Sequence, residues 1–150
     1  MTLDELKAQV LLDLSVDNEH LDTESLKNQE IKAKYLDIKS KYELLLFKAK
    51  GDYKRIYRDK WEYYGGKSDA KVYVSKPFDI KVLKTDLNVY ITSDQDVIDA
   101  ENKIGYLETV VDYIKGVIKS VDNRGWDIKN SIEWKKFEAG VTYWWKKTIK

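Results

Sequence analysis

The chain has 150 residues, with 27 lysines or arginines against 26 aspartates or glutamates, one histidine, one proline and no cysteine. This length predicts one domain, or one domain with an appendage, and the lack of cysteine excludes disulfides, thiolate zinc sites and a cysteine nucleophile. Charged side chains make up 35% of the chain, which is polar for a compact domain and favours an elongated or oligomeric protein.

Nothing in the sequence points to a membrane or to secretion. No stretch approaches the ~18 to 20 apolar residues that a membrane span requires. The first residues also lack the basic-then-apolar order of a signal peptide. We therefore expect a soluble intracellular protein of the cytoplasm, with no membrane partner.

The charge is divided into blocks along the chain. Residues 1–26 carry one basic and seven acidic side chains, whereas residues 27–60 carry eleven basic and five acidic ones. Such blocks can serve charge complementarity between subunits, or they can concentrate a basic surface for a polyanion. The nearly neutral total is therefore a poor guide to partners.

A short helix is predicted at the N-terminus. Thr2 and Glu5 match the S/T-x-x-E capping box, in which each side chain bonds the other residue's backbone N–H. Apolar residues follow at positions 3, 6, 10 and 14, which is helical spacing.

Residues 23–64 predict one long helix. Its apolar positions alternate steps of four and three: Ile31, Tyr35, Ile38, Tyr42, Leu45 and Ala49. At 1.5 Å per residue such a helix is roughly 60 Å long, too long for the rest of the chain to cover, so a partner chain is expected. Gly51 costs about 1 kcal/mol relative to alanine inside a helix and is the candidate position for a bend or break.

A small β element is predicted for residues 65–92. Gly65 and Gly66 form the clearest helix stop in the sequence. Three short β-prone runs follow, at 72–74, 80–83 and 87–91, separated by turn residues. These runs predict two or three short strands.

A second strong helix is predicted from Ser93 and Asp94, which offer an N-cap. Its apolar residues keep the alternation of three and four for more than three heptads, which is typical of helices that associate. They are Val97, Ala100, Ile104, Leu107, Val111, Ile114, Ile118 and Val121.

The C-terminal part is predicted to hold one more helix. Residues 123–125 (Asn-Arg-Gly) fit a helix C-cap, a further helix is expected over 127–139, and residues 141–150 form an aromatic and basic tail.

Together the elements predict one mainly α domain with a small β element, of the α+β class. Its parts are a helical arm over 1–64, the β element over 65–92, a helical bundle part over 93–140 and the tail over 141–150.

The end of the long helix interleaves cations with aromatic residues. Single-stranded nucleic acid is bound by such combinations, because cations neutralise phosphates and aromatic faces stack on bases. The same pattern also fits a solvated basic face over a packed aromatic seam. The residues concerned are Lys54, Arg55, Tyr57, Arg58, Lys60 and Trp61.

No catalytic, metal or cofactor site is expected. Asp94, Asp96, Asp99 and Glu101 lie in the first turns of a predicted helix, where the helix dipole favours acidic residues. His20 lies in a polar linker without a catalytic partner at a motif spacing. The sequence also lacks the glycine-rich phosphate-binding patterns.

The tail contains Trp144 and Trp145, within the run Tyr-Trp-Trp-Lys-Lys. Large aromatic residues at a chain end are typical of docking onto another subunit. Packing onto the chain's own bundle and stacking on nucleic acid remain alternatives.

Several segments resemble, in the same order, the UvsY family of recombination mediators from tailed myoviruses. They are KRIYRDKWEYYGGKSD (54–69), KTDL (84–87), ITSDQDV (91–97) and NRGWDIKNSIEWKKFEAG (123–140). The resemblance is carried best by the basic helix that ends in Tyr-Tyr-Gly-Gly and by the Arg-Gly-Trp before a helix that ends in Phe-Glu-Ala-Gly.

The resemblance implies a non-enzymatic mediator that binds single-stranded DNA inside a phage-infected bacterial cell. Such proteins help to displace a single-stranded-DNA-binding protein and to load a RecA-like recombinase. They form ring-like homo-oligomers, and six or seven subunits are implied here.

The family motif also implies roles for particular residues. Two basic residues two apart, implicated in DNA binding, fall on Arg58 and Lys60, with Asp59 where the family has a small residue. We expect support from Lys54, Arg55 and Lys67, and stacking on Tyr57 or Trp61. The expected subunit contacts are Ile104, Leu107, Val111, Ile114, Ile118, Phe137, Trp144 and Trp145.

The alternative function is an oligomeric coiled-coil scaffold that binds only protein. It shares the heptads, the charge blocks and the aromatic tail, but it needs no polyanion surface. Salt dependence separates the two, because phosphate binding weakens steeply as salt rises.

Overall fold

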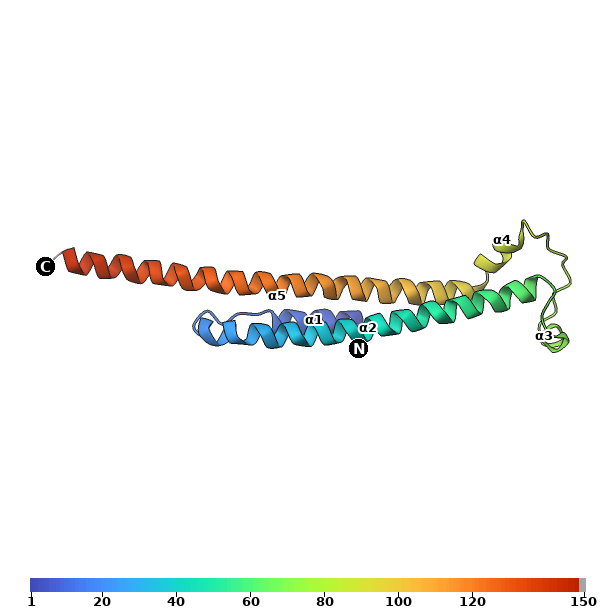
Figure 1. Ribbon diagram of the computed structural model, residues 1–150, viewed down its shortest axis with the longest axis horizontal. Helices are drawn as coiled ribbons and strands as arrows, with labels where there is room; N and C mark the ends of the chain where they lie inside the picture. Colours follow the sequence, from blue (N-terminus) through green and yellow to red (C-terminus); the bar gives the residue numbers. More distant parts are fainter. Residues whose placement is uncertain (149–150) are drawn as a thin grey trace. The chain divides into compact units, whose positions relative to one another are not determined.

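The computed structural model describes residues 1–148, and residues 141–146 by their backbone alone. These residues form five helices: α1 (Leu3–Asp13), α2 (Leu21–Tyr64), α3 (Ala70–Ser75), α4 (Leu87–Thr92) and α5 (Gln95–Thr148) (Figure 1). None of the five is long and apolar enough to cross a membrane. The chain divides into two compact units, one made of residues 1–40 and the part of α5 from 112 onward, the other of residues 41–111.

The predicted N-terminal helix is present as α1, which belongs to the first unit. The capping box is present, since Glu5 N–H donates to Thr2 Oγ1 at 3.2 Å and Thr2 N–H donates to Glu5 Oε2 at 2.8 Å. At the other end of α1, Asp13 Oδ2 accepts bonds from Lys34 Nζ and from the hydroxyl of the fully buried Tyr35, each at 2.7 Å. Burial by itself raises the pKa of Asp13, but these two bonds outweigh it and hold the pKa below its usual value.

The core of the first unit is aliphatic apart from Tyr35, and it comes from all three of the unit's helices. Its side chains pack because the seam positions of α2 and α5 recur every three or four residues and so stay on one helix face. The most buried are Leu6, Val10, Leu21, Tyr35, Ile114, Val117, Val121 and Ile128.

The predicted β element is wrong. Residues 1–148 contain no strand: positions 72–74 lie in α3, 87–91 lie in α4, and 80–83 lie outside any regular element. A β-prone run becomes a strand only when a neighbouring strand pairs with it, and no such strand is present among the described residues. Two of the runs form short helices instead. In the first of these, the ring of Tyr73 stacks on Tyr63 with centroids 5.5 Å apart. The fold of the described residues is therefore all-α.

Two predicted interruptions of the helices are absent. α2 runs through Gly51, and α5 runs for 54 residues through positions 123–125, so the predicted C-cap there and the separate helix over 127–139 are wrong. Gly125 has a packing role rather than a stop role. A Cβ on Gly125 would lie 3.0 Å from Asn28 Nδ2, so the glycine permits a close approach of α5 to α2 within the first unit.

The predicted stop at the end of α2 is confirmed. Gly66 has φ of 72°, its N–H bonds the carbonyl of Tyr63 at 3.3 Å, and Lys67 N–H bonds the carbonyl of Glu62 at 2.8 Å. This pair of bonds is a Schellman motif, which closes the open carbonyls of a last helical turn.

Replacing Gly66 with alanine is expected to lower the free energy of unfolding by about 1 kcal/mol, because a Cβ is strained at positive φ. Urea denaturation followed by circular dichroism measures the change. Gly105, inside α5, is the matched control, since a Cβ added there would meet open space. Alanine at Gly105 is expected to stabilise by up to about 1 kcal/mol. Equal effects at both glycines would contradict the assignment.

Candidate nucleic-acid interface

An exposed basic face lies along the last turns of α2, in the second unit. Lys54, Arg58 and Trp61 are spaced by four and three residues, so they share one side of the helix, and Arg55 lies beside them. Arg55 and Arg58 have 68% and 67% of their side chains exposed. The face points away from the packed side of α2, which carries the buried Ala49.

The cations on this face are only lightly neutralised. Arg55 Nη1 lies 3.0 Å from Asp52 Oδ1, and Arg58 Nη2 lies 3.7 Å from Asp59 Oδ1. Both are exposed pairs, and such pairs contribute little and exchange easily. Within residues 1–148, Lys54 has no ion-pair partner. All three cations are thus available to an external anion.

Trp61 forms the aromatic part of the face. Its side chain is 40% exposed, and Lys67 Nζ lies 4.3 Å from the ring centroid, a cation–π contact. The backbone of Lys67 is part of the Schellman motif, since its N–H bonds the carbonyl of Glu62, and this places Lys67 near the Trp61 ring. The structure therefore brings Trp61 and Lys67 together with Arg58, one turn away.

Tyr57, the other predicted stacking residue, lies differently. It is half-buried, its ring is 6.1 Å from that of Tyr53, and its hydroxyl donates to Asn88 Oδ1 at 3.1 Å. These contacts attach Tyr57 to α4. Stacking of a base on this ring stays a prediction.

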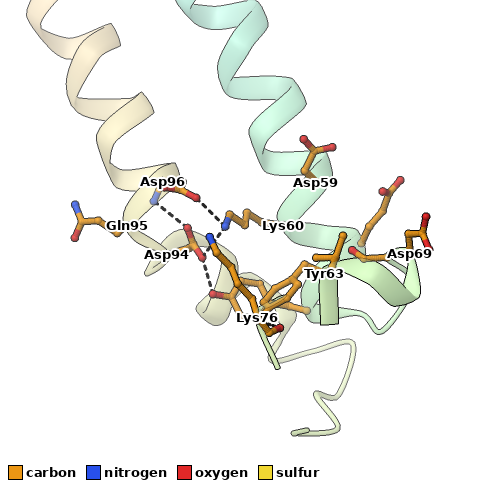
Figure 2. A pocket seen from close by; sticks show the side chains of 12 residues that line it. Asp59, Lys60, Tyr63, Asp69, Lys76, Asp94, Gln95 and Asp96 are labelled. Atoms are coloured by element: carbon orange, nitrogen blue, oxygen red, sulfur yellow. Dashed lines mark hydrogen bonds and ion pairs between the residues drawn. The ribbon is translucent and has the colours of Figure 1, made fainter. Parts of the chain in front are cut away.

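Lys60 reaches to the opposite side of α2. Figure 2 shows its ammonium group between two carboxylates at the start of α5, 2.8 Å from Asp96 Oδ2 and 3.4 Å from Asp94 Oδ2. Only 17% of the Lys60 side chain is exposed. Burial alone lowers the pKa of Lys60, but the hydrogen bond to Asp96 and the charge of Asp94 outweigh it and raise the pKa.

Asp94 is the centre of this contact. Its Oδ1 accepts the N–H of Asp96 at 2.9 Å, which makes Asp94 the N-cap of α5. Its Oδ2 accepts the Tyr64 hydroxyl at 2.6 Å. Burial, together with this bond to Asp94, raises the pKa of Tyr64. Asp94 thus caps α5 and Asp96 lies in its first turn, as the sequence interpretation has it, whereas Asp99 and Glu101 lie beyond the first turn.

The surroundings make the stability of this contact depend on pH. Burial alone raises the pKa of Asp94, but its bond from Tyr64, the N–H of Asp96 and the Lys60 charge outweigh burial and leave the pKa lowered. A lowered pKa stabilises the folded chain fully above the ordinary value, near 4, and this contribution is lost as the pH falls through the folded value.

We therefore expect Asp94→Asn to make the free energy of unfolding fall less steeply as the pH is lowered into the acid range. Urea midpoints of the wild type and the variant should differ at pH 7 and converge below about pH 4. A difference that stays constant down to pH 2 would contradict the linkage.

A cavity of about 700 Å³ adjoins Lys60 (Figure 2). It has an excess of negative charge, since its lining contains two lysines, Lys60 and Lys76, against five carboxylates: Asp59, Glu62, Asp69, Asp94 and Asp96. Such a cavity repels phosphate. In the described residues no group of three or more potential metal ligands is arranged around one point.

An aromatic cluster packs beneath the end of α2. Phe78 contacts Tyr63 and Tyr64 with centroids 5.5 and 5.0 Å apart, and Tyr90 of α4 contacts Tyr64 at 5.8 Å. The Tyr63 hydroxyl also donates to the carbonyl of Lys76 at 3.0 Å. The Tyr-Tyr pair of the sequence motif is therefore part of the packing that supports the basic face.

The residues predicted for subunit contacts have different environments in the single chain. Leu107, Val111 and Ile114 are buried within the single chain, and Ile104 and Ile118 are half-buried.

Phe137 is 61% exposed and stacks on Trp134, which is exposed to the same extent. The side chains of Trp144 and Trp145 lie outside the described residues. Their roles between subunits stay predictions.

Sequence reasoning missed a buried ion pair in the first unit. Arg124 and Glu24 are 5% and 6% exposed, and the Arg124 guanidinium bonds the Glu24 carboxylate. A signal was present: continuing the α5 heptad from Val121 by three residues reaches Arg124. Counting back from Ile31 in α2 by three and four reaches Asn28, another partner of Arg124, and Glu24.

Comparisons with known proteins agree with this architecture. The family model described as "Recombination, repair and ssDNA binding protein UvsY" matches residues 9–141. The recombination protein uvsY of Enterobacteria phage T4 is 22% identical over 140 residues, which cover 93% of this chain and 99% of that protein.

Crystal structures of the bacteriophage T4 recombination mediator protein UvsY have the same fold. The lattice type II structure has a TM-score of 0.82 at 22% identity, covering 93% of this chain and 98% of that one. The lattice type I structure has a TM-score of 0.80 at 21% identity, covering 89% and 98%.

Proposed function

Because the chain belongs to the UvsY family of recombination, repair and single-stranded-DNA-binding proteins, we propose that it holds single-stranded DNA on the exposed basic face at the end of α2. The observation that carries this proposal is the lightly neutralised set of cations beside Trp61, within the matched segment. Phosphates need exposed cations, and bases need an accessible aromatic ring.

Each basic residue of the face has a proposed part. Lys54, Arg55 and Arg58 contact successive phosphates, exchanging weak pairs with Asp52 and Asp59 for stronger charge-assisted bonds. A base stacks on Trp61, and Lys67 moves from the ring to the adjacent phosphate. None of these contacts reads a base edge, so binding is expected to be largely independent of sequence.

Affinity comes from repetition of the face in a ring-like homo-oligomer. One face offers only a few exposed charges, each of modest value. Several faces acting on one strand multiply their effects, because every later contact is intramolecular. The proposed subunit contacts are exposed aromatic residues of α5, such as Trp134 and Phe137. The Trp144–Trp145 segment is proposed to join them.

As a mediator, the protein would act by competition on the strand. Occupying the backbone phosphates weakens the hold of a single-stranded-DNA-binding protein and leaves the strand open to a RecA-like recombinase. No catalytic step by this chain is part of the proposal.

The first experiment is a titration of a fluorescently labelled single-stranded oligonucleotide, followed by anisotropy at several salt concentrations. We expect tight binding that prefers single over double strands, with log K falling by about 0.7 per phosphate contact for each unit of log salt. No binding at low salt by folded, assembled protein would refute the proposal and favour a scaffold that binds only protein. Sedimentation in parallel gives the subunit number.

A further inference from the structure

Arg58 and Lys60 cannot grip one strand from the same side of α2. Residues two apart in an α-helix are separated by about 200° around the axis, so their side chains leave on opposite faces. The two environments differ accordingly. Arg58 is 67% exposed, whereas Lys60 is 17% exposed and points to the start of α5 (Figure 2).

The Lys60 ammonium is paired with two carboxylates, Asp94 and Asp96. Asp94 is itself held by its bond to the Asp96 N–H and by the Tyr64 hydroxyl, and it is 12% exposed. Asp96, 60% exposed, adds the shorter contact, at 2.8 Å. These two carboxylates therefore take the positions around the ammonium that phosphate oxygens would need.

The space around Lys60 also disfavours a strand. The adjoining cavity carries more carboxylates than lysines, so a phosphate entering it meets net negative charge. A DNA strand bound to Arg58 and Trp61 would therefore gain no favourable charge interaction by entering this cavity.

What Lys60 does hold is the end of α2. It lies between Arg58 and Trp61 in sequence, in the last turns before the helix stops at Tyr64. Last turns fray unless side chains fix them. The contact with Asp94 and Asp96 joins this end of the helix to the capped start of α5.

From this geometry we infer that Lys60, clamped by Asp94 and Asp96, is a positioning residue for single-stranded DNA. It holds the end of α2 so that Arg58, Trp61 and Lys67 present one continuous surface, and it contacts no phosphate itself. This inference rests on the proposed function of the basic face.

Lys60→Met tests the inference, with Arg58→Ala as the reference for a phosphate contact. In the full-length protein we expect Lys60→Met to lower oligonucleotide affinity about fivefold, a loss in the range of one charge pair. The salt slope should stay at the wild-type value. Arg58→Ala should instead reduce the slope by about 0.7 per bound subunit. Circular dichroism and sedimentation establish that each variant is folded and assembled.

The double variant Asp94→Asn/Asp96→Asn separates a positioning role of Lys60 from a phosphate contact, because the two roles predict opposite changes in DNA affinity. Removing two negative charges would raise affinity if Lys60 were a phosphate contact held back by them. Loss of the clamp is expected to lower affinity, although asparagine can still cap α5 and accept the Tyr64 bond.

The two variants together decide between the explanations. Lower affinity in both variants with an unchanged salt slope supports the positioning role. A reduced slope in Lys60→Met, a gain of affinity in the double variant, or unchanged affinity in both would overturn it. If Arg58→Ala also left affinity and slope unchanged, the proposed basic face itself would be refuted.

Discussion

Replacing Lys54, Arg55 and Arg58 together with alanine is expected to lower the affinity for single-stranded DNA at least about tenfold. Each exposed phosphate pair contributes about 0.5 kcal/mol, and three sum to roughly the 1.4 kcal/mol of a tenfold change. The loss grows further when several subunits hold one strand. The slope of log K against log salt should fall by about 2 per bound subunit. Anisotropy titrations measure both quantities.

A matched control removes the same charge elsewhere. Lys103, Lys115 and Lys119 are exposed on α5, and their triple alanine variant has an equal change of net charge. We expect it to bind the oligonucleotide within about twofold of the wild type, because only long-range electrostatics is altered. Equal losses in the two triple variants would mean that net charge, and no particular face, drives binding.

Arg124→Leu is expected to lower the melting temperature by about 10 °C, the largest stability effect of any single change considered. Its guanidinium donates to the carbonyls of Glu24 at 2.9 Å and Ser15 at 3.1 Å, to Asn28 Oδ1 at 3.0 Å and to the Glu24 carboxylate. Leucine leaves all these acceptors in place and leaves the buried Glu24 carboxylate with only the half-exposed Lys27, whose Nζ lies 3.0 Å from Glu24 Oε1. Thermal melting followed by circular dichroism measures the shift.

A surface pair in the same unit provides the comparison. Lys32 Nζ lies 2.9 Å from Asp122 Oδ1, with 36% and 54% of the two side chains exposed. Lys32→Ala should shift the melting temperature by about 2 °C or less, since water replaces the lost partner. The double variant Glu24→Gln/Arg124→Met should recover part of the loss, because it leaves no buried charge unpaired: Lys27, the other partner of Glu24, is 53% exposed and can be solvated. Similar shifts for Lys32→Ala and Arg124→Leu would show that burial of the pair has no energetic weight.

The helices were predictable where local chemistry decides. The capping box at Thr2 and Glu5, the three-four alternation of α2 and α5, and the stop at Gly66 each depend on residues close in sequence. The family resemblance noted from the sequence is confirmed by the match over residues 9–141.

The failures lie where distant residues decide. Whether residues 72–74 form a strand depends on a partner strand, which the described residues do not supply. The pattern around Gly125 wrongly predicts a helix stop. The glycine instead permits close contact with Asn28, and local sequence cannot show this because Asn28 lies about a hundred positions away.

The basic face could be predicted from the sequence only in part. Positions 54, 58 and 61 follow from helical spacing alone, but the partner of each cation does not. Tyr53, Ile56, Lys60 and Tyr64 are half-buried and continue the packed side of α2 beyond Ala49. Lys60 therefore faces inward, whereas Arg58 stays on the exposed side of the helix.

The ammonium of Lys67 over the Trp61 ring also gives the molecule an optical reporter. The other four of its five tryptophans lie at positions 126, 134, 144 and 145, all within α5. Converting those four to phenylalanine would leave one indole emitter, at the end of α2, with a cation against its face. Its emission should change when Lys67 departs, so stopped-flow fluorescence could time the arrival of a base on the ring separately from the assembly of subunits on the strand.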